Sequence, residues 1–415
     1  MTDRLRFFLK RLGQRLWLRP LVACVFSLGA VFFAKAAEGI DAPVVTSESV
    51  EALLSILATG MLPVATFAVA SMVSAYASAS TNATPRSFPL VVSDDVSQNA
   101  LSSFVGAFIY GIVAQVALMN EYYGPDALFV LFCLTIGVLV AVVLMFVHWV
   151  DRIARLGRLG ATVDKVENAT AEALRIRLQQ PFLRGVAPRS RANAGRPVFG
   201  DSVGFVQRVD IERLQSFAAE HSLRIVVNAV PGDFSTPSVP LAHLVAEADA
   251  AEIDPAEVIR AFVVQQDRTF AADPGFGLVV LSEIASRALS PAINDPGTAI
   301  DVLGTYVRIF ALWANTEAED APSVCDRVEV PELDPADLLT DAFRAIARDG
   351  AGMVEVALTL QLALGSIANM GDGILREPAQ AQSILALARA ERALDLQDDL
   401  DVVRAAHLAA ASVAT

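Results

Sequence analysis

The stretch ALFVLFCLTIGVLVAVVLMFV, residues Ala127–Val147, contains no charged side chain. An α-helix rises about 1.5 Å per residue, so a helix of this length crosses the hydrocarbon layer of a bilayer, which is about 30 Å thick. The stretch therefore predicts a transmembrane helix, and we expect the chain of 415 residues to be an integral membrane protein.

Three further apolar stretches precede this one. Ala100–Met119 also lacks a charge, and Ala52–Ala79 is long and rich in small residues. Leu21–Ala34 is shorter, and it spans only if Arg19 and Lys35 extend their charged ends to the interfaces. A short apolar stretch behind a basic N-terminus is also typical of a cleaved signal peptide, so that alternative stays open. Residues 1–150 thus predict a transmembrane domain with about four spans, near residues 16–37, 52–79, 100–119 and 127–147.

Positive charges near the span ends predict the orientation. Six Lys and Arg residues precede residue 20, and Arg152, Arg155 and Arg158 follow the last span. Cytoplasmic loops carry an excess of such charges. We therefore expect both termini on the cytoplasmic side, which requires an even number of spans.

The rest of the chain is acidic. Residues 166–415 hold 20 Lys and Arg against 35 Asp and Glu. This balance excludes nucleic acid as a partner, because binding to nucleic acid needs clustered cations. The acidity either keeps the domain soluble or draws cations toward a pore. The three cysteines have neither disulfide nor metal-site spacing, and we expect no metal and no cofactor.

The soluble part divides into three predicted segments. Residues 151–200 predict a helical stalk and a linker rich in Pro and Gly, and residues 251–415 predict a mainly helical cytoplasmic domain. Between them, residues 201–250 predict a small β-rich subdomain. Its strands are expected at Phe205–Val209, at Leu223–Val227 and near Val239–Val245, with a helix that begins at Asp210.

Within residues 251–415, helices are expected at Leu339–Ala347, Val354–Ala368 and Ala379–Ala414, with breaks at Gly350, at Gly371-Asp372-Gly373 and at Pro378.

This β-rich segment weakly resembles the small barrel of biotinyl and lipoyl carriers. No lysine follows Lys165, which excludes attachment of either group. The expected fold class is a membrane α-helical bundle plus a cytoplasmic α+β domain, with a small β-barrel-like subdomain and a mainly helical remainder.

Hydroxyl side chains share one face at the end of the predicted span 52–79. They form either a close seam between helices or the lining of a pore, and the residues are Ser71, Ser74, Ser78 and Thr81. In the following loop, Pro85 should end the helix, and Arg86 either anchors the loop at the interface or contacts an anion at a gate. The candidate residues of this loop are Thr84, Pro85, Arg86, Asp94, Asp95 and Gln98.

A second polar group surrounds Asp273-Pro274 and two successive cap-and-proline pairs, Ser290-Pro291 and Asp295-Pro296. One interpretation is helix punctuation around a tight corner, because Ser or Asp followed by Pro is typical of a helix start. The other is a cytoplasmic pocket that binds an anion at helix N-termini. Its candidate residues are Asp267, Arg268, Asp273, Arg287, Ser290, Asn294, Asp295 and Thr298.

One pattern could indicate an enzyme. Gly200–Gly204 matches G-x-S-x-G, the pattern of a serine nucleophile, but a Pro- and Gly-rich linker stands where that chemistry needs a strand. The sequence also lacks P-loop and zinc-protease motifs. We therefore expect no enzyme.

Several short motifs, in this order along the chain, resemble those of a bacterial family of predicted membrane proteins known as a domain of unknown function (DUF two-two-five-four). They are Ser80–Arg86, Asp95, Gln98, Phe104, Phe108, Tyr110, Gly204–Val206, Pro231–Phe234, Arg268-Thr269, Asp273-Pro274, Phe276-Gly277 and, above all, Arg287–Ala299. The chain departs from the family at Phe205, where the family tends to have Tyr. The resemblance implies a location in the bacterial inner membrane and brings no activity with it.

Together these features predict an oligomeric ion or small-solute channel or transporter, gated by its cytoplasmic domain. We expect a homo-oligomer, because a pore lined by one span of a small bundle requires symmetry. The alternative is a membrane-anchored ligand-sensing or scaffold protein without transport. The expected partners are the lipid bilayer, further copies of the chain, and an ion or small ligand.

Overall fold

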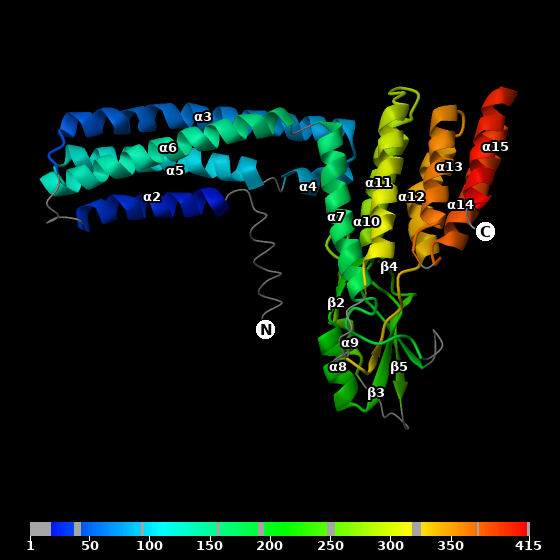
Figure 1. Cartoon of the computed structure of the whole chain (residues 1–415). Coiled ribbons are helices and arrows are strands. Elements are labelled where there is room, and N and C mark those ends of the chain that lie inside the picture. Colours follow the sequence, from blue (N-terminus) through cyan, green and yellow to red (C-terminus); the bar gives the residue numbers. More distant parts are fainter. Residues whose placement is uncertain are drawn as a thin grey trace. The chain divides into compact units, whose positions relative to one another are not determined.

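The computed structural model describes residues 18–36, 43–92, 95–155, 158–189, 195–246, 254–317, 325–371 and 373–412. The chain forms two compact units, Met1–Thr162 and Val163–Thr415. The first holds the long apolar helices, and the second holds two sheets and a group of helices (Figure 1).

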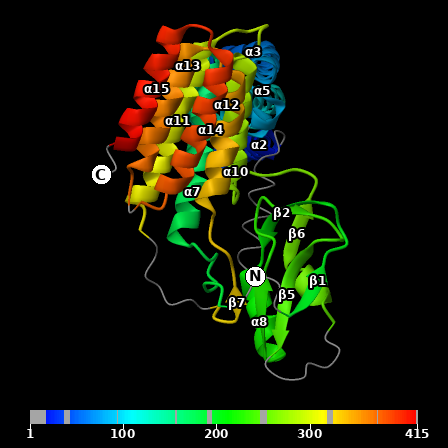
Figure 2. The ribbon, with the colours of Figure 1, turned by 90° about the vertical axis from the view of Figure 1, so that its right-hand side faces the viewer.

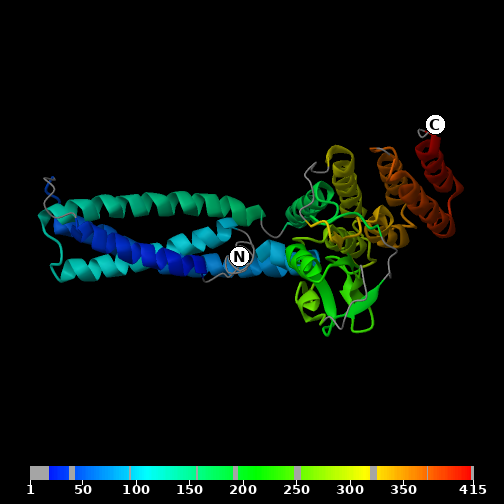
Figure 3. The ribbon, with the colours of Figure 1, turned by 90° about the horizontal axis from the view of Figure 1, so that it is seen from below.

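Four long helices lie side by side in the first unit (Figures 1 and 3). They are α2 (Leu18–Ala36), α3 (Ser47–Asn82), α5 (Asp95–Met119) and α6 (Pro125–Arg155), with the short η1 (Pro85–Ser87) and α4 (Phe88–Val92) between α3 and α5. Within the described residues, α3, α5 and α6 are long and apolar enough to cross a membrane. The apolar part of α2, Pro20–Ala34, is shorter, so the fourth span stays a prediction.

Glycine allows these helices to approach closely. A Cβ atom at Gly111 of α5 would lie 2.9 Å from the backbone nitrogen of Ala58 in α3, so this contact needs a residue without a side chain. On the same bundle, the hydroxyls of Tyr110 and Thr135 are 3.0 Å apart and join α5 to α6. Trp149 is buried in this core, whereas Phe26 and Leu144 are exposed, as expected for side chains that face lipid.

The second unit contains two separate sheets. The first has the strand order β1-β5-β3-β7 and the second has β4-β2-β6. Neighbouring strands pair antiparallel except β3 and β7, which pair parallel. The strands are β1 (Arg196–Phe199), β2 (Gly204–Val209), β3 (Leu223–Val227), β4 (Phe234–Ser235), β5 (Pro240–Ala246), β6 (Phe262–Gln265) and β7 (Val328–Glu329).

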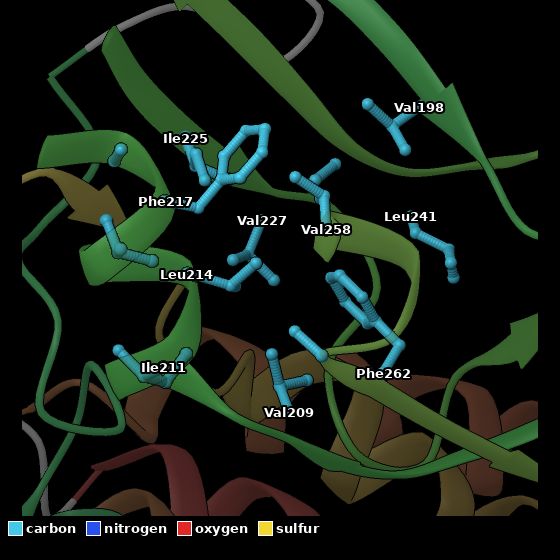
Figure 4. Packing of buried hydrophobic residues seen from close by; sticks show 14 of the residues in the cluster. Val198, Val209, Ile211, Leu214, Phe217, Ile225, Val227, Leu241, Val258 and Phe262 are labelled. Atoms are coloured by element: carbon cyan, nitrogen blue, oxygen red, sulfur yellow. The ribbon is translucent and has the colours of Figure 1, made fainter. Parts of the chain in front are cut away.

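A helix packs against the strands of this segment. The amphipathic α8 (Ile211–Glu220) begins at Asp210, which accepts a hydrogen bond from the Arg213 N–H as predicted. Its buried Leu214 and Phe217 pack into the core with strand residues such as Val227 (Figure 4). Each sheet keeps two edge strands, so the predicted β-barrel-like subdomain is wrong and the segment is an open mixed α/β arrangement.

Strands also lie where the sequence predicts other structure. The strand β1 falls in the predicted linker, and β6, which follows the short α9 (Ala256–Ile259), falls in a segment predicted to be helical. The strand β7 is more than 60 residues further along the chain. These three strands have two to four residues each, too few to show a period of two.

Helices form the other end of the second unit (Figure 2). After α7 (Leu159–Gln179) come α10 (Pro274–Ala288), α11 (Pro296–Asn315), α12 (Pro335–Asp349), α13 (Val354–Ala368), α14 (Arg376–Ala393) and α15 (Gln397–Ser412). The predicted break at Pro378 is wrong. Pro378 lies in the first turn of α14, where a missing N–H costs nothing, and the break follows Ala393.

Candidate functional site

The centre of the candidate site is an ion pair between Arg268 and Asp273, in the loop that joins β6 to α10. The guanidinium donates from Nε to one carboxylate oxygen at 2.7 Å and from Nη2 to the other at 2.9 Å. The side chains are only 20% and 7% exposed. Asp273 also accepts the N–H of Phe276 at 2.9 Å and so caps α10. One carboxylate thus fixes both the loop and the start of the helix.

Residues far away in the sequence surround this pair. The Cζ atom of Arg268 lies 6.0 Å from the centre of the Phe205 ring and 5.4 Å from that of Phe276. Phe205 in turn contacts Phe234, with ring centres 5.1 Å apart. These distances allow cation–π attraction between the guanidinium and both rings.

The turn before Phe234 approaches the pair from the sheet. Gly232 has a φ of 105°, and a Cβ atom there would lie 2.8 Å from the carboxyl carbon of Asp273. Only glycine adopts this conformation freely and leaves room for the carboxylate. We refer to Phe205, Gly232, Asp233, Phe234, Arg268, Asp273 and Phe276 as the Arg268 cluster.

Carboxyl groups around the cluster are protonated more readily than usual. Burial raises the pKa of Asp233, and the charges of Asp273 and Asp337 add to the effect while Arg268 opposes it. Burial likewise raises the pKa of Asp341. Among the described residues, no group of three or more His, Cys, Asp and Glu side chains is arranged to hold a metal ion.

The helix α7 packs closely against α10 and α11. A Cβ atom at Gly277 of α10 would overlap with the side chain of Thr170 in α7. Further along, Arg308 of α11 forms a bidentate ion pair with Glu167 at 2.7 and 2.6 Å. The contacts hold α7, α10 and α11 in one fixed arrangement.

The structure divides the predicted cytoplasmic pocket into two places. Asp267, Arg268 and Asp273 lie before α10, whereas the other predicted residues lie at its far end or beyond. A helix of 15 residues is about 22 Å long, so the two groups share no pocket. The residues at the far end are Arg287, Ser290, Asn294, Asp295 and Thr298.

This second group forms the corner between α10 and α11. Asn294 has a left-handed φ of 53° and donates its N–H to the carbonyl of Ser290 at 2.8 Å. The Ser290 hydroxyl donates to the carbonyl of Arg287 at 2.7 Å. The prediction that Ser290 starts a helix is therefore wrong. Asp295 accepts the N–H and the hydroxyl of Thr298 and caps α11. Here the geometry is that of helix punctuation.

The predicted hydroxyl face lies near the end of α3. Ser74 and Thr81 are exposed, and Ser71 and Ser78 are half-buried. The buried side of the same turns is formed by Met72 and Tyr76, which pack against α4. The hydroxyls therefore face away from this contact.

The loop after α3 contains both buried and exposed candidates. Thr84 is buried and caps η1, with Pro85 in its first turn, and Arg86 is exposed. Gln98 is buried and donates from Nε2 to the carbonyl of Val92 at 3.0 Å. Asp95 begins α5, and Asp94 lies outside the described residues.

Sequence reasoning missed a buried polar cluster among the last three helices. Ser383 of α14 donates its hydroxyl to Oε1 of Gln361 at 2.5 Å, and Nδ1 of His407 lies 2.7 Å from the same hydroxyl. Gln361 also donates from Nε2 to the Ser383 carbonyl at 3.1 Å. The signal was a single glutamine in the apolar stretch Val354–Ala368.

Comparison with known proteins gives the family. A model of the family described as "Predicted membrane protein (DUF2254)" matches residues 13–366. The chain belongs to this family of predicted membrane proteins. Five of the motifs that resemble this family meet in or beside the Arg268 cluster, although they are spread along 74 residues of sequence. They are Gly204–Val206, Pro231–Phe234, Arg268-Thr269, Asp273-Pro274 and Phe276-Gly277.

Curated relatives come from mycobacteria. The chain is 29% identical over 230 residues to Uncharacterized protein MT1328 of Mycobacterium tuberculosis, a match that covers 53% of this chain and 43% of that protein. It is 28% identical, with the same coverage, to Uncharacterized protein Mb1321c of Mycobacterium bovis. The match thus spans less than half the length of these relatives. No solved structure matches the chain.

Proposed function

We propose that the chain is a subunit of a homo-oligomeric channel for ions or small solutes in the bacterial inner membrane, with both termini in the cytoplasm. In this proposal the second unit gates the channel and catalyses no reaction. The observation that carries it is the short chain connection between α6 and α7. Only residues 156–158 separate α7 from the candidate span α6, and α7 is locked to α10 and α11. In the proposed mechanism, a change in the second unit is transmitted through α7 to the end of this span.

A groove on α6 supports an oligomer. Phe129, Val130, Cys133, Leu134, Gly137, Val138 and Ala141 line an apolar hollow of about 470 Å³. Cys133, Gly137 and Ala141 are spaced four residues apart, so small side chains form its floor. No atom lies within 4 Å of the position that a Cβ at Gly137 would take. Small residues at this spacing let a second helix approach closely in a membrane, and a second copy of α6 fits the groove.

The chain offers a direct test of this contact. Cys133 is exposed, whereas Cys24 is half-buried and Cys325 is buried. We expect mild oxidation of membranes to link two copies through Cys133, giving a dimer band on a non-reducing gel. Cys133→Ser should remove the band and Gly137→Leu should weaken it, while Cys24→Ser leaves it unchanged. A band that survives Cys133→Ser would contradict the contact.

The transport itself is tested in proteoliposomes loaded with K⁺, Na⁺, Ca²⁺ or Cl⁻. We expect flux of at least one ion, reduced at least tenfold by Ser74→Leu, because the bulky side chain replaces a hydroxyl of the proposed pore lining. Thr59→Leu is the matched control, since Thr59 is an exposed hydroxyl residue on the same helix. Absence of flux for all four ions would overturn the channel proposal.

The alternative is a ligand sensor without transport. It is favoured by a pocket in the second unit that contains a buried arginine, described below. Ligand binding by a protein that shows no flux would support this alternative.

A further inference from the structure

A pocket of about 360 Å³ opens in the second unit, and none of its lining residues belongs to the Arg268 cluster. Four chain segments line it: the end of α7, the end of α11, the loop between β7 and α12, and the loop between α13 and α14. Its size is in the range of small-molecule sites in proteins. The lining residues that matter for its chemistry are Arg177, Trp313, Glu332, Leu333 and Ile374.

Arg177, which lines this pocket, has a hydrogen-bonding group without a partner among the described residues. Its side chain is almost fully buried, at 4% exposure, and its Nη2 donates to the carbonyl of Pro331 at 2.6 Å. Its Nη1 is also buried but has no hydrogen-bond partner among the described residues. Burial lowers the pKa of Arg177 to about 10, so the group remains a cation at neutral pH. A buried cationic donor without a partner is costly, and a negatively charged oxygen would satisfy it.

Glu332 brings the opposite charge to the same pocket. Its carboxylate attracts Arg177 electrostatically, yet no salt bridge joins the two among the described residues. The pocket lining thus contains a positive and a negative side chain that no salt bridge joins among the described residues. A ligand with an anionic group and a cationic group can pair with both at once.

Apolar side chains form part of the remaining lining, beside the polar Thr316. Trp313 is half-buried at the end of α11, and Leu333 and Ile374 add aliphatic surface. Such a wall contributes binding free energy by removing apolar ligand surface from water.

From this arrangement we infer that the pocket binds a zwitterionic small molecule of the α-amino-acid class with an apolar side chain. The carboxylate pairs with Arg177, the ammonium group with Glu332, and the side chain lies against Trp313. The inference does not depend on transport, because the binding test below is independent of flux.

The test uses the full-length protein in detergent and three matched probes. L-leucine carries both charged groups, 4-methylpentanoate lacks the ammonium group, and 3-methylbutylamine lacks the carboxylate. We expect L-leucine to change the fluorescence of Trp313 saturably and to bind at least tenfold more tightly than either analogue. Trp313→Phe identifies the signal, since the chain has only three tryptophans. No saturable change with L-leucine would overturn the assignment. Equal affinity for all three probes would overturn it as well, because it would show that the two charged groups do not recognise the ligand.

Two variants separate the roles of the charges. Glu332→Gln should weaken L-leucine binding at least tenfold and leave 4-methylpentanoate binding unchanged, because only the ammonium partner is lost. Arg177→Met should weaken both. Glu355→Gln, at an exposed position on α13, is the control. Thermal unfolding checks that each variant is folded, and if Arg177→Met is not, Glu332→Gln alone decides: unchanged L-leucine affinity in Glu332→Gln refutes the assignment.

Discussion

The ion pair of Arg268 and Asp273 is expected to contribute strongly to the stability of the second unit. Asp273→Ala removes the cap of α10, which costs about 1 kcal/mol. It also leaves the Arg268 guanidinium, only 20% exposed, without its partner. Breaking a buried pair costs about 3–5 kcal/mol, and the partial exposure of Arg268 favours the lower end. We therefore expect a loss of about 4 kcal/mol for Asp273→Ala and about 3 kcal/mol for Asp273→Asn, since Asn also caps helices.

The assay is urea unfolding of the full-length protein, followed by the fluorescence of Trp313. In the sequence, Trp313 is the sole tryptophan after Trp149, so it reports on the second unit. Arg268→Met combined with Asp273→Asn should cost clearly less than the sum of the single changes, because the double variant has no unpaired charge. Arg404→Met, which breaks a more exposed pair with Glu391, should cost less than about 1 kcal/mol. A loss below about 1 kcal/mol for Asp273→Asn, or additive single changes, would refute the reasoning.

Three further outcomes can be measured by the same unfolding assay. Gly277→Ala should cost about 1–3 kcal/mol through overlap with the Thr170 side chain, and Thr170→Ala should restore part of this; no rescue would place the strain elsewhere. Asp341→Asn should raise the free energy of unfolding at neutral pH. The pKa of Asp341 is raised in the folded protein, so ionisation of this carboxyl opposes folding and the stability of the unchanged protein falls as pH rises above the usual pKa of 3.8. The advantage of the Asn variant should therefore vanish below pH 3.8. Ser383→Ala should cost about 1–3 kcal/mol, since Oε1 of Gln361 loses its donor at 2.5 Å and keeps only the longer contact of 3.3 Å with Nδ1 of His407; a neutral effect would show that this contact or water replaces the hydroxyl.

Elements with a strong local pattern could be predicted from the sequence. The strand β3 and the helix α13 have the predicted bounds, and α8 begins at the predicted cap. Whether the strands close into a barrel could not be predicted in this way, because closure depends on which strands pair. β3 pairs with β7, about 100 residues away, and no local pattern shows this contact.

The candidate site shows a similar limit. The pairing of Arg268 with Asp273 spans five residues and is local. The same cap-and-proline pattern at Asp273-Pro274 and Asp295-Pro296 marks two helix starts. The sequence therefore indicates that the helix α10 lies between the two groups of predicted pocket residues and keeps them apart. The approach of Phe205 and Gly232 to Arg268 arises from tertiary packing, and the sequence gives no sign of it.

The parallel pairing of β3 with β7 has a consequence for biosynthesis. The ribosome makes β3 about 100 residues before β7, and until then β3 has a free edge next to the strand pair that it forms with β5. An unpaired edge is a template for association with other chains. The nascent chain therefore remains open to aggregation until residue 329 has emerged, and a chaperone that covers β3 during this interval would raise the yield of folded protein.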